Sequence, residues 1–164
     1  MRVLIADDNP VFLAVLREML RSWGYDVLTA TDGAEAWNVL RSENAPPIAI
    51  LDWMMPLMDG IEVCRRVRIS SRRSGYPYIL ILTAKADPDS LIEALDAGAD
   101  DFIQKPFRSP ELRARLRTGR RILELQERPE LLAVPRLHVV PLSPSQRPPS
   151  TQASECDAGL PAIT

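Results

Sequence analysis

Short apolar runs alternate along the chain with longer segments in which apolar residues recur at helical spacing. The short runs have the length and composition of buried β-strands, and they span residues 2–6, 25–30, 48–52, 78–83 and 101–104. The periodic segments predict helices over residues 10–23, 32–40, 61–69, 88–97 and 109–128. This alternation predicts an α/β protein with a parallel sheet, right-handed crossovers and helices on both faces. The run at 78–83 is the most hydrophobic, which predicts the central or most deeply covered strand.

Polar residues at the ends of the helical segments support their boundaries. Asn9 can cap the first helix, Pro10 suits its first turn, and Gly24 can end it. Asp32 and Glu35 have the spacing of a capping box, which predicts the start of the second helix.

Length and charge narrow the class of protein. The chain has 164 residues, of which 46% are hydrophobic and 26% charged, enough for one globular domain with an appendage. Its net charge of −2 provides no overall basic field, so direct nucleic-acid binding is not expected. The N-terminal residues resemble neither a signal peptide nor a membrane span, and two widely separated cysteines, Cys64 and Cys156, fit a reducing compartment. These features predict a soluble cytoplasmic protein.

Polar side chains gather at the carboxyl ends of the predicted strands. Five residues stand at or just after such ends: Asp7, Asp8, Asp52, Thr83 and Lys105. In an open parallel sheet these ends meet at one edge, where ligands bind. Each residue alone has an ordinary explanation as a helix cap, a turn, a strand-terminal residue or a surface lysine. Their joint arrival at the ends of successive strands favours a functional site.

The three carboxylates predict a divalent metal. Carboxylates a few ångströms apart repel each other by about 4 kcal/mol per pair at an effective dielectric constant of about 20, and Lys105 supplies only one positive charge. Oxygen ligands favour Mg²⁺ over zinc, because the His and Cys pattern of a zinc site is missing and the one histidine, His138, lies in the tail. Beside Mg²⁺ and a lysine, Asp52 is the best candidate nucleophile for a phosphoryl group, since it is single, central and followed by the apolar Trp53 and Met54.

Four motifs, in their order and spacing, resemble the receiver domain of two-component response regulators. They read ADDNP at 6–10, LDWMMPLMDG at 51–60, LTAKAD at 82–87 and AGADDFIQKPF at 97–107. The resemblance covers residues 1–121 and implies a (βα)5 doubly wound, flavodoxin-like fold with strand order 2-1-3-4-5. It also implies that a histidine kinase or phosphotransfer protein phosphorylates Asp52 in the presence of Mg²⁺, and that the domain then changes conformation to control a partner or output domain.

The resemblance further assigns roles to single residues. It implies that Asp8 and Asp52 bind Mg²⁺ directly, Asp7 through a water molecule, and Met54 through its backbone carbonyl. These four residues are the expected metal site.

The resemblance also implies a switch. Thr83 and Lys105 are expected to contact phosphoryl oxygens, and the peptide bond between Lys105 and Pro106 to be cis. Thr83 is then drawn towards the phosphoryl group and Phe102 moves inward into the vacated space. The family often has tyrosine at position 102, so Phe102 lacks a hydroxyl that can form a hydrogen bond in either state, and it is alternatively a plain core residue.

The segment 122–164 holds the end of the last helix and a tail rich in Pro and Ser, which is predicted to be disordered because it has no apolar period. It contains no recognisable output domain. The arginines of the last helix read as a solvated face, with a nucleic-acid stripe as the less favoured interpretation. They are Arg113, Arg115, Arg117, Arg120 and Arg121.

Two classes of function compete. The favoured one is a phosphoacceptor signalling domain, not an enzyme, either alone or as part of a longer regulator. The alternative is a Mg²⁺-dependent phosphatase of the haloacid dehalogenase type, which normally has a second acid two residues after the nucleophile, where this chain has Met54.

Signal output is expected through a partner or a second copy on the face made by the helix at 88–97, the strand at 101–104 and the last helix. Candidate inter-subunit ion pairs on this face join Arg108 or Arg113 to Asp96, Asp100 or Asp101.

Overall fold

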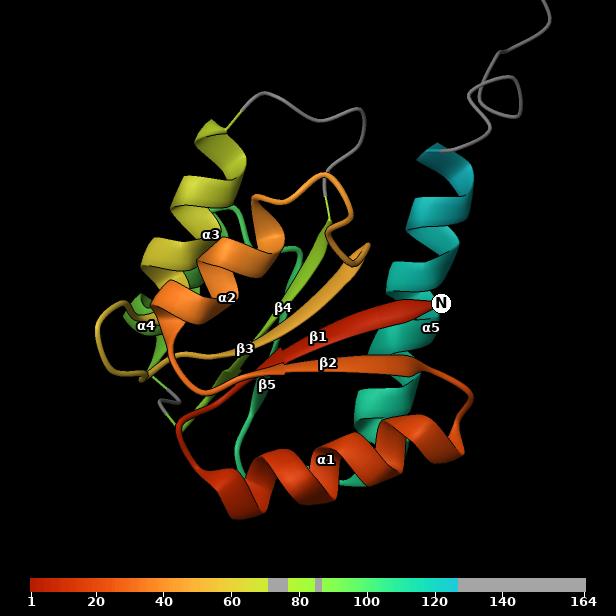
Figure 1. The fold of residues 1–164 in the computed structure, drawn as a ribbon. Helices are drawn as coiled ribbons and strands as arrows, with labels where there is room; N and C mark the ends of the chain where they lie inside the picture. The colour runs from red at the N-terminus through yellow and green to blue at the C-terminus, as the bar shows by residue number, and fades with distance from the viewer. Residues whose placement is uncertain (71–76, 85–86, 127–164) are drawn as a thin grey trace, which may run out of the picture. The chain divides into compact units, whose positions relative to one another are not determined.

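Five parallel strands form one sheet in the order β2-β1-β3-β4-β5, which confirms the predicted fold class and strand order (Figure 1). The strands are β1 (Arg2–Ala6), β2 (Asp26–Ala30), β3 (Ile48–Asp52), β4 (Tyr78–Thr83) and β5 (Asp101–Gln104). The helices are α1 (Pro10–Ser22), α2 (Gly33–Leu40), α3 (Gly60–Ile69), α4 (Pro88–Asp96) and α5 (Ser109–Gln126). The computed structural model describes residues 1–70, 77–84 and 87–126. The predicted tail and the last two residues of the last predicted helix lie outside the described residues.

The register of the sheet aligns the carboxyl ends of its strands along one edge. The pairs nearest this edge are Ala6 with Ala30, Ala6 with Leu51, Asp52 with Leu82, and Thr83 with Gln104. The central strand is β3, as the order 2-1-3-4-5 implies, and β4 lies beside it. Every residue of β4 is buried, which confirms the deep coverage expected for 78–83. The hydrophobicity of a run determines how deeply it is covered, but the crossovers determine its place in the sheet.

Alternate residues of the strands enter two separate cores. Helices α2, α3 and α4 cover one face of the sheet, and α1 and α5 cover the other (Figure 1). On the first face the strands contribute Leu4, Ala49, Leu51, Ile79 and Ile81. On the second face they contribute Val3, Ile5, Ile48, Ile50, Leu80 and Leu82. This alternation follows from the two-residue period of a strand, and burial on both faces explains why the runs are continuously apolar.

Side-chain caps begin the helices at the expected places. The Asn9 side chain accepts hydrogen bonds from the backbone N–H groups of α1, and Gly24 follows that helix with a φ of 82°. The Asp32 side chain accepts from the Glu35 N–H at 2.8 Å, as in a capping box. The Glu35 carboxylate, however, accepts from the N–H of Thr31 at 2.8 Å and not from that of Asp32, so the reciprocal half of the box is displaced by one residue.

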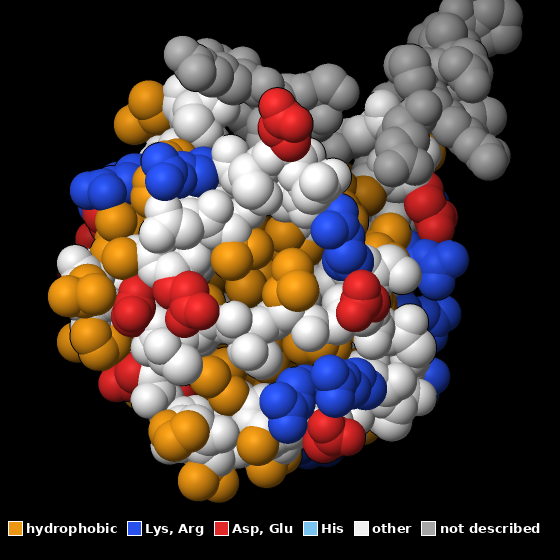
Figure 2. Space-filling view, in the orientation of Figure 1, with side chains coloured by type: hydrophobic (Ala, Val, Ile, Leu, Met, Phe, Trp, Pro, Cys, Tyr) orange, Lys and Arg blue, Asp and Glu red, His pale blue; other side chains and the backbone are white. Residues whose placement is uncertain are grey.

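Helix α5 extends beyond the predicted receiver boundary at residue 121 and ends at Gln126. Its inward residues are Leu112, Leu116, Gly119 and Leu123. On the face drawn in Figure 2, several basic side chains line the edge formed by α5, with acidic side chains near them. No helix in the described part of the chain combines the length and the apolar character needed to cross a bilayer.

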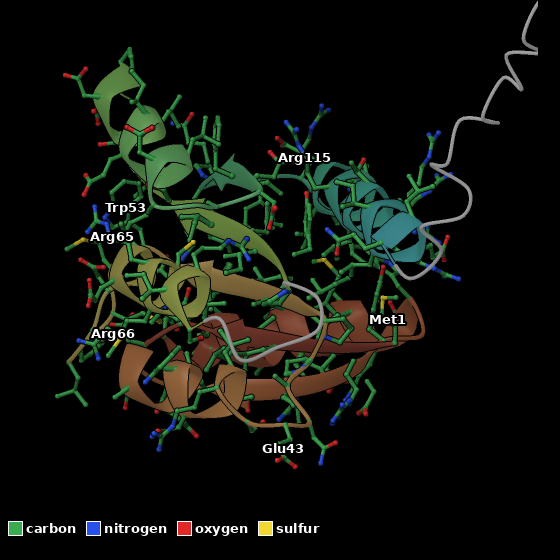
Figure 3. All side chains as sticks on the ribbon, turned by 90° about the horizontal axis from the view of Figure 1, so that it is seen from above. Met1, Glu43, Trp53, Arg65, Arg66 and Arg115 are labelled. Carbon is green, nitrogen blue, oxygen red and sulfur yellow. The ribbon has the colours of Figure 1, made fainter. Side chains whose placement is uncertain are left out.

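Several arginines of α5 interact within the domain. Arg115 pairs with Asp101 of β5 at 3.1 Å, Arg120 pairs with Glu124 at 2.8 Å, and the guanidinium of Arg113 lies 5.6 Å from the centre of the Trp23 ring. Figure 3 shows Arg115 on α5, beside the sheet. These contacts fit the interpretation of a solvated, locally paired face.

Candidate functional site

Three carboxylates meet beyond the carboxyl ends of β1 and β3. One oxygen from each of Asp7, Asp8 and Asp52 lies within 4.8 Å of the others. Asp7 and Asp52 are buried, with 2% and 8% of their surface exposed, whereas Asp8 is exposed. We call these three residues the carboxylate cluster. Because only Asp8 is open to water, the repulsion between the other two is poorly screened and needs a cation close by.

Lys105 supplies that cation from a distant part of the sequence. Its ammonium donates a hydrogen bond to Asp7 at 2.7 Å and another to Asp52 at 2.6 Å. The sequence separations are 98 and 53 residues. Residues 48–60 contain no basic side chain, so the positive charge beside Asp52 comes from the loop after β5. The peptide bond from Lys105 to Pro106 is cis.

Burial and neighbouring charges shift the pKa values of Asp52 and Lys105. Burial raises the pKa of Asp52; the hydrogen bond and charge of Lys105 oppose this increase, and the charges of Asp7 and Asp8 add to it. Burial lowers the pKa of Lys105, but its hydrogen bonds to Asp52 and Asp7 and their charges raise it by more, so the net shift is upward. Lys105 thus remains an ammonium, and among the described residues it faces three carboxylates with a single positive charge.

Backbone hydrogen bonds hold the strand ends against each other. The N–H of Trp53 donates to the carbonyl of Leu82 at 2.8 Å, which joins the end of β3 to β4. The N–H of Lys105 donates to the carbonyl of Thr83 at 2.7 Å, which joins the loop after β5 to the end of β4. Backbone contacts between neighbouring strand ends therefore position Asp52, Thr83 and Lys105. Trp53 makes the contact for β3, and Lys105 makes it for β5.

The loop after β3 brings Gly60 into contact with the backbone of Asp52 and Trp53. Gly60 donates its N–H to the carbonyl of Trp53 at 2.9 Å, and its Cα lies so close to the Asp52 carbonyl that a side chain at position 60 would collide with this oxygen. Of the two apolar residues after Asp52, Trp53 is buried, but the side chain of Met54 is 63% exposed. The Trp53 side chain belongs to the core under α2, α3 and α4, and the exposed Met54 can offer the site its backbone.

The two predicted switch residues lie in different surroundings. Thr83 is 1% exposed and ends β4. Phe102 is half-buried, sits opposite Ile81 in the register of β4 and β5, and packs against the core under α2, α3 and α4. Both therefore lie in the two strands on the α4 side of the site.

Sequence reasoning missed three residues around Lys105. Phe12 presents its ring to the Lys105 ammonium, which lies 4.4 Å from the ring centre. Phe107 packs edge-on against Phe12, with ring centres 6.0 Å apart and planes at 84°. Asn9, predicted only as a helix cap, also donates its N–H to Asp7 at 2.9 Å. The local signal for Phe12 was its place on the inward face of α1, which is the ordinary signature of a core residue.

The donor set of the carboxylate cluster fits Mg²⁺. All three side chains offer hard oxygen ligands, and the exposed Asp8 leaves one side of the site open to water and to a phosphate oxygen. Among the described residues, no histidine or cysteine joins this cluster, as a zinc site would require. The excess of carboxylates over ammonium among these residues would favour the binding of a divalent cation.

Comparison with known proteins places the chain in a family. The model of the response regulator receiver domain matches residues 3–117. The DNA-binding response regulator MtrA of Mycolicibacterium smegmatis is 41% identical over 133 residues, which make up 81% of this chain and 56% of MtrA. The response regulator MprA of Mycobacterium avium is 44% identical over 117 residues, 71% of this chain and 50% of MprA. The chain thus spans about half the length of these curated relatives.

Solved structures agree with this placement. The receiver domain of the Francisella response regulator 1452 superposes with a TM-score of 0.65 at 32% identity, covering 71% of this chain and 93% of that one. The receiver domain of the sensor histidine kinase PA1611 of Pseudomonas aeruginosa, solved with magnesium in its active site cleft, has a TM-score of 0.63 at 33% identity, covering 72% and 95%. The family match over residues 3–117 shows that this chain belongs to the response regulator receiver domains, and the order of the strands and the acids at their ends agree with it.

Proposed function

We propose that Asp52 accepts a phosphoryl group from a histidine kinase or phosphotransfer protein in the cytoplasm, and that Mg²⁺ is required. The observation that carries the proposal is the partly buried bridge from Lys105 to both Asp7 and Asp52, where three carboxylates outnumber the one ammonium found among the described residues. A structural ion pair needs no such excess of acid. A site that must hold a cation and then a phosphoryl group does.

The chemistry assigns a role to each residue. A carboxylate oxygen of Asp52 attacks phosphorus, the bond from phosphorus to the donor's nitrogen or oxygen breaks, and the leaving group takes the electron pair. Lys105, already 2.6 Å from Asp52, neutralises charge on the transferred group, and Thr83 donates its hydroxyl to a phosphoryl oxygen. Asp8, Asp52 and the backbone carbonyl of Met54 would hold Mg²⁺ directly, and Asp7 through water. The metal supplies charge neutralisation of the phosphoryl oxygens.

The proposed output is a change in the affinity of the α4, β5 and α5 face for a protein partner or a second copy. Thr83 and Phe102 lie on β4 and β5, at the border of this face. A movement of Thr83 towards a phosphoryl group on Asp52 would therefore be passed directly to this face. The shift can favour a partner only by its difference in affinity for the two states, commonly about 1 to 3 kcal/mol. In the structure, Asp101 pairs with Arg115 and Asp100 with Arg68 of the same chain, so inter-subunit ion pairs through these acids would have to compete with existing ones.

The role of the whole regulator extends beyond the receiver. MtrA is by its name a DNA-binding response regulator, and this chain matches 56% of it. We propose that the receiver controls an output that is not among residues 1–126, and that the receiver itself does not contact nucleic acid. The phosphatase alternative has no support in the family match or in the relatives named above.

The decisive experiment is phosphorylation by acetyl phosphate, followed by the mass of the intact protein. Wild type should gain one phosphoryl group with Mg²⁺ and none with excess EDTA, and Asp52→Asn should gain none. The matched control is Asp59→Asn, which removes an exposed carboxylate that only caps α3, and it should be labelled like wild type. Label on Asp52→Asn, or label that survives EDTA, would refute the assignment.

A further inference from the structure

The Lys105 ammonium has three N–H donors, and the two carboxylates that it bridges account for two of them. The face of the Phe12 ring lies on another side of the ammonium, with the ring centre 4.4 Å from the nitrogen. An aromatic face attracts a cation through its quadrupole but accepts no strong hydrogen bond. The ring therefore holds the ammonium without competing with the carboxylates for its donors.

Phe12 is itself tied to the carboxylate cluster by its backbone. Asn9 accepts a hydrogen bond from the Phe12 N–H at 3.1 Å through its side chain, and donates its own N–H to Asp7 at 2.9 Å. Asp7 in turn accepts from Lys105. The contacts form a closed circuit from Asp7 through Asn9 and Phe12 to Lys105 and back to Asp7. A displacement of the ring therefore changes the position of the ammonium relative to both acids.

The loop that carries Lys105 contacts the same ring. Phe107, two residues after Lys105, packs edge-on against Phe12 in a T-shaped arrangement, and both rings are half-buried against the core under α1 and α5. Edge-to-face pairs of this kind have a preferred geometry. The start of α1 and the loop after β5 are thus held together by aromatic contacts beside the ion bridge.

From this geometry we infer that Phe12 is a positioning residue for the phosphoryl-transfer site, which holds the Lys105 ammonium between Asp7 and Asp52 through a cation–π contact. The inference rests on the proposed function and deepens it. Phe12 acts only through Lys105 and makes no contact of its own with the phosphoryl donor or the acceptor oxygen. Losing the ring should allow the lysine to sample other rotamers, so that fewer molecules have the ammonium in place when a donor binds.

The test uses lysine resonances, because the chain has only two lysines, Lys85 and Lys105. Protein labelled with ¹³C-lysine on a Lys85→Arg background shows Lys105 alone. In the metal-free, unphosphorylated state, Phe12→Leu should move the Lys105 side-chain protons downfield, since they lose the shielding of the ring face. Phe12→Tyr, which keeps an aromatic face, should leave them near their original positions. Val11→Ala, an exposed neighbour on α1, is the matched control and should not move them.

The rate of phosphorylation by acetyl phosphate with Mg²⁺ is the second readout. Phe12→Leu should be about two- to fivefold slower than wild type, the range that corresponds to a partly exposed cation–π contact. Phe12→Tyr, which keeps an aromatic face, should keep a rate near that of wild type. Unchanged Lys105 resonances in Phe12→Leu, or equal slowing in the Leu and Tyr variants, would overturn the inference. Labelling of Asp52→Asn would instead refute the proposed function, while the resonance comparison, which needs no phosphoryl transfer, would still stand.

Discussion

Two clusters of charged side chains join distant parts of this chain, and they differ in their balance of charge. In the carboxylate cluster, one ammonium faces three acids among the residues that the structure describes. In the second, which we call the Arg68 cluster, Arg68 donates to Asp100 at 2.6 Å, to the carbonyl of Gly98 at 2.8 Å and to the carbonyl of Pro77 at 3.0 Å. Asp100 also accepts from the N–H of Ile79 at 2.7 Å.

The difference separates a structural cluster from a functional one. Among the described contacts, the Arg68 cluster pairs one cation with one anion, and it connects α3 to the end of α4 and to the start of β4. In the carboxylate cluster the acids outnumber the described cation. Burial raises the pKa of Asp52, Lys105 lowers it, and the charges of Asp7 and Asp8 raise it. Charges that are paired within the chain hold elements of the fold together. Carboxylates without a matching cation can instead bind a charged ligand. The predictions below test this contrast.

The largest expected effect is on stability. Arg68→Met keeps the apolar stem but leaves Asp100 and two carbonyls without the guanidinium, so the free energy of unfolding should fall by about 3 kcal/mol. Asp52→Asn should not lower it in metal-free buffer, because the substitution removes a carboxylate that burial disfavours. Urea unfolding followed by tryptophan fluorescence measures both.

The matched control for this prediction is Arg66→Met, on the same helix as Arg68. Arg66 pairs with Glu62 at 2.7 Å in an exposed i,i+4 contact, and Figure 3 shows it at the outer side of α3. Its loss should cost about 0.5 kcal/mol. The contrast between the clusters fails if Asp52→Asn proves as destabilising as Arg68→Met.

The next effect concerns Cys64, which is buried near the Arg68 cluster. Burial raises the pKa of this thiol from 9.0 to about 11, with a smaller lowering by Arg68 and a smaller raising by Asp100. An increase from 9.0 to about 11 reduces the thiolate fraction about a hundredfold at pH 8. In a Cys156→Ser background, alkylation of the folded protein should therefore be at least about a hundredfold slower than in urea, and faster as the pH rises. Equal rates in the two conditions would contradict the burial of Cys64.

Mg²⁺ should stabilise the carboxylate cluster and leave the Arg68 cluster unaffected. A ligand that binds only the folded state adds about 1.4 kcal/mol for each tenfold excess over its dissociation constant. We expect the midpoint of thermal unfolding to rise with added Mg²⁺ in wild type and in Arg68→Met, and much less in Asp52→Asn. Na⁺ at matched ionic strength is the control. An equal rise in all three proteins would indicate general screening.

The smallest effect is the dependence of stability on pH in the absence of metal. The pKa of Asp52 is raised in the folded protein, so the folded state binds a proton at pH values where the unfolded state has already released it. Raising the pH through the range above 3.8 therefore favours unfolding at this residue. The stability of wild type relative to Asp52→Asn should decline over that range. A difference that grows with pH would mean that Lys105 outweighs burial.

Local patterns in the sequence were sufficient to predict the elements and most of their ends. The caps at Asn9 and Asp32 act over two or three residues, and the inward face of α3, with Val63, Cys64 and Val67, follows from helical spacing. The acids at the strand ends were equally visible, because strand direction alone brings those ends to one edge. Such features depend on neighbours in the chain, so a single sequence is enough to recognise them.

Side-chain contacts between distant elements were decided only by the tertiary structure. The pairing of Asp100 with Arg68 and the contact of Phe12 with Lys105 join residues that no local period relates. An inward phenylalanine on α1 has the same sequence signature whether it fills a core or holds a lysine. The difference arises from the crossovers, which bring the loop after β5 back beside the start of α1, and packing then selects which side chains meet.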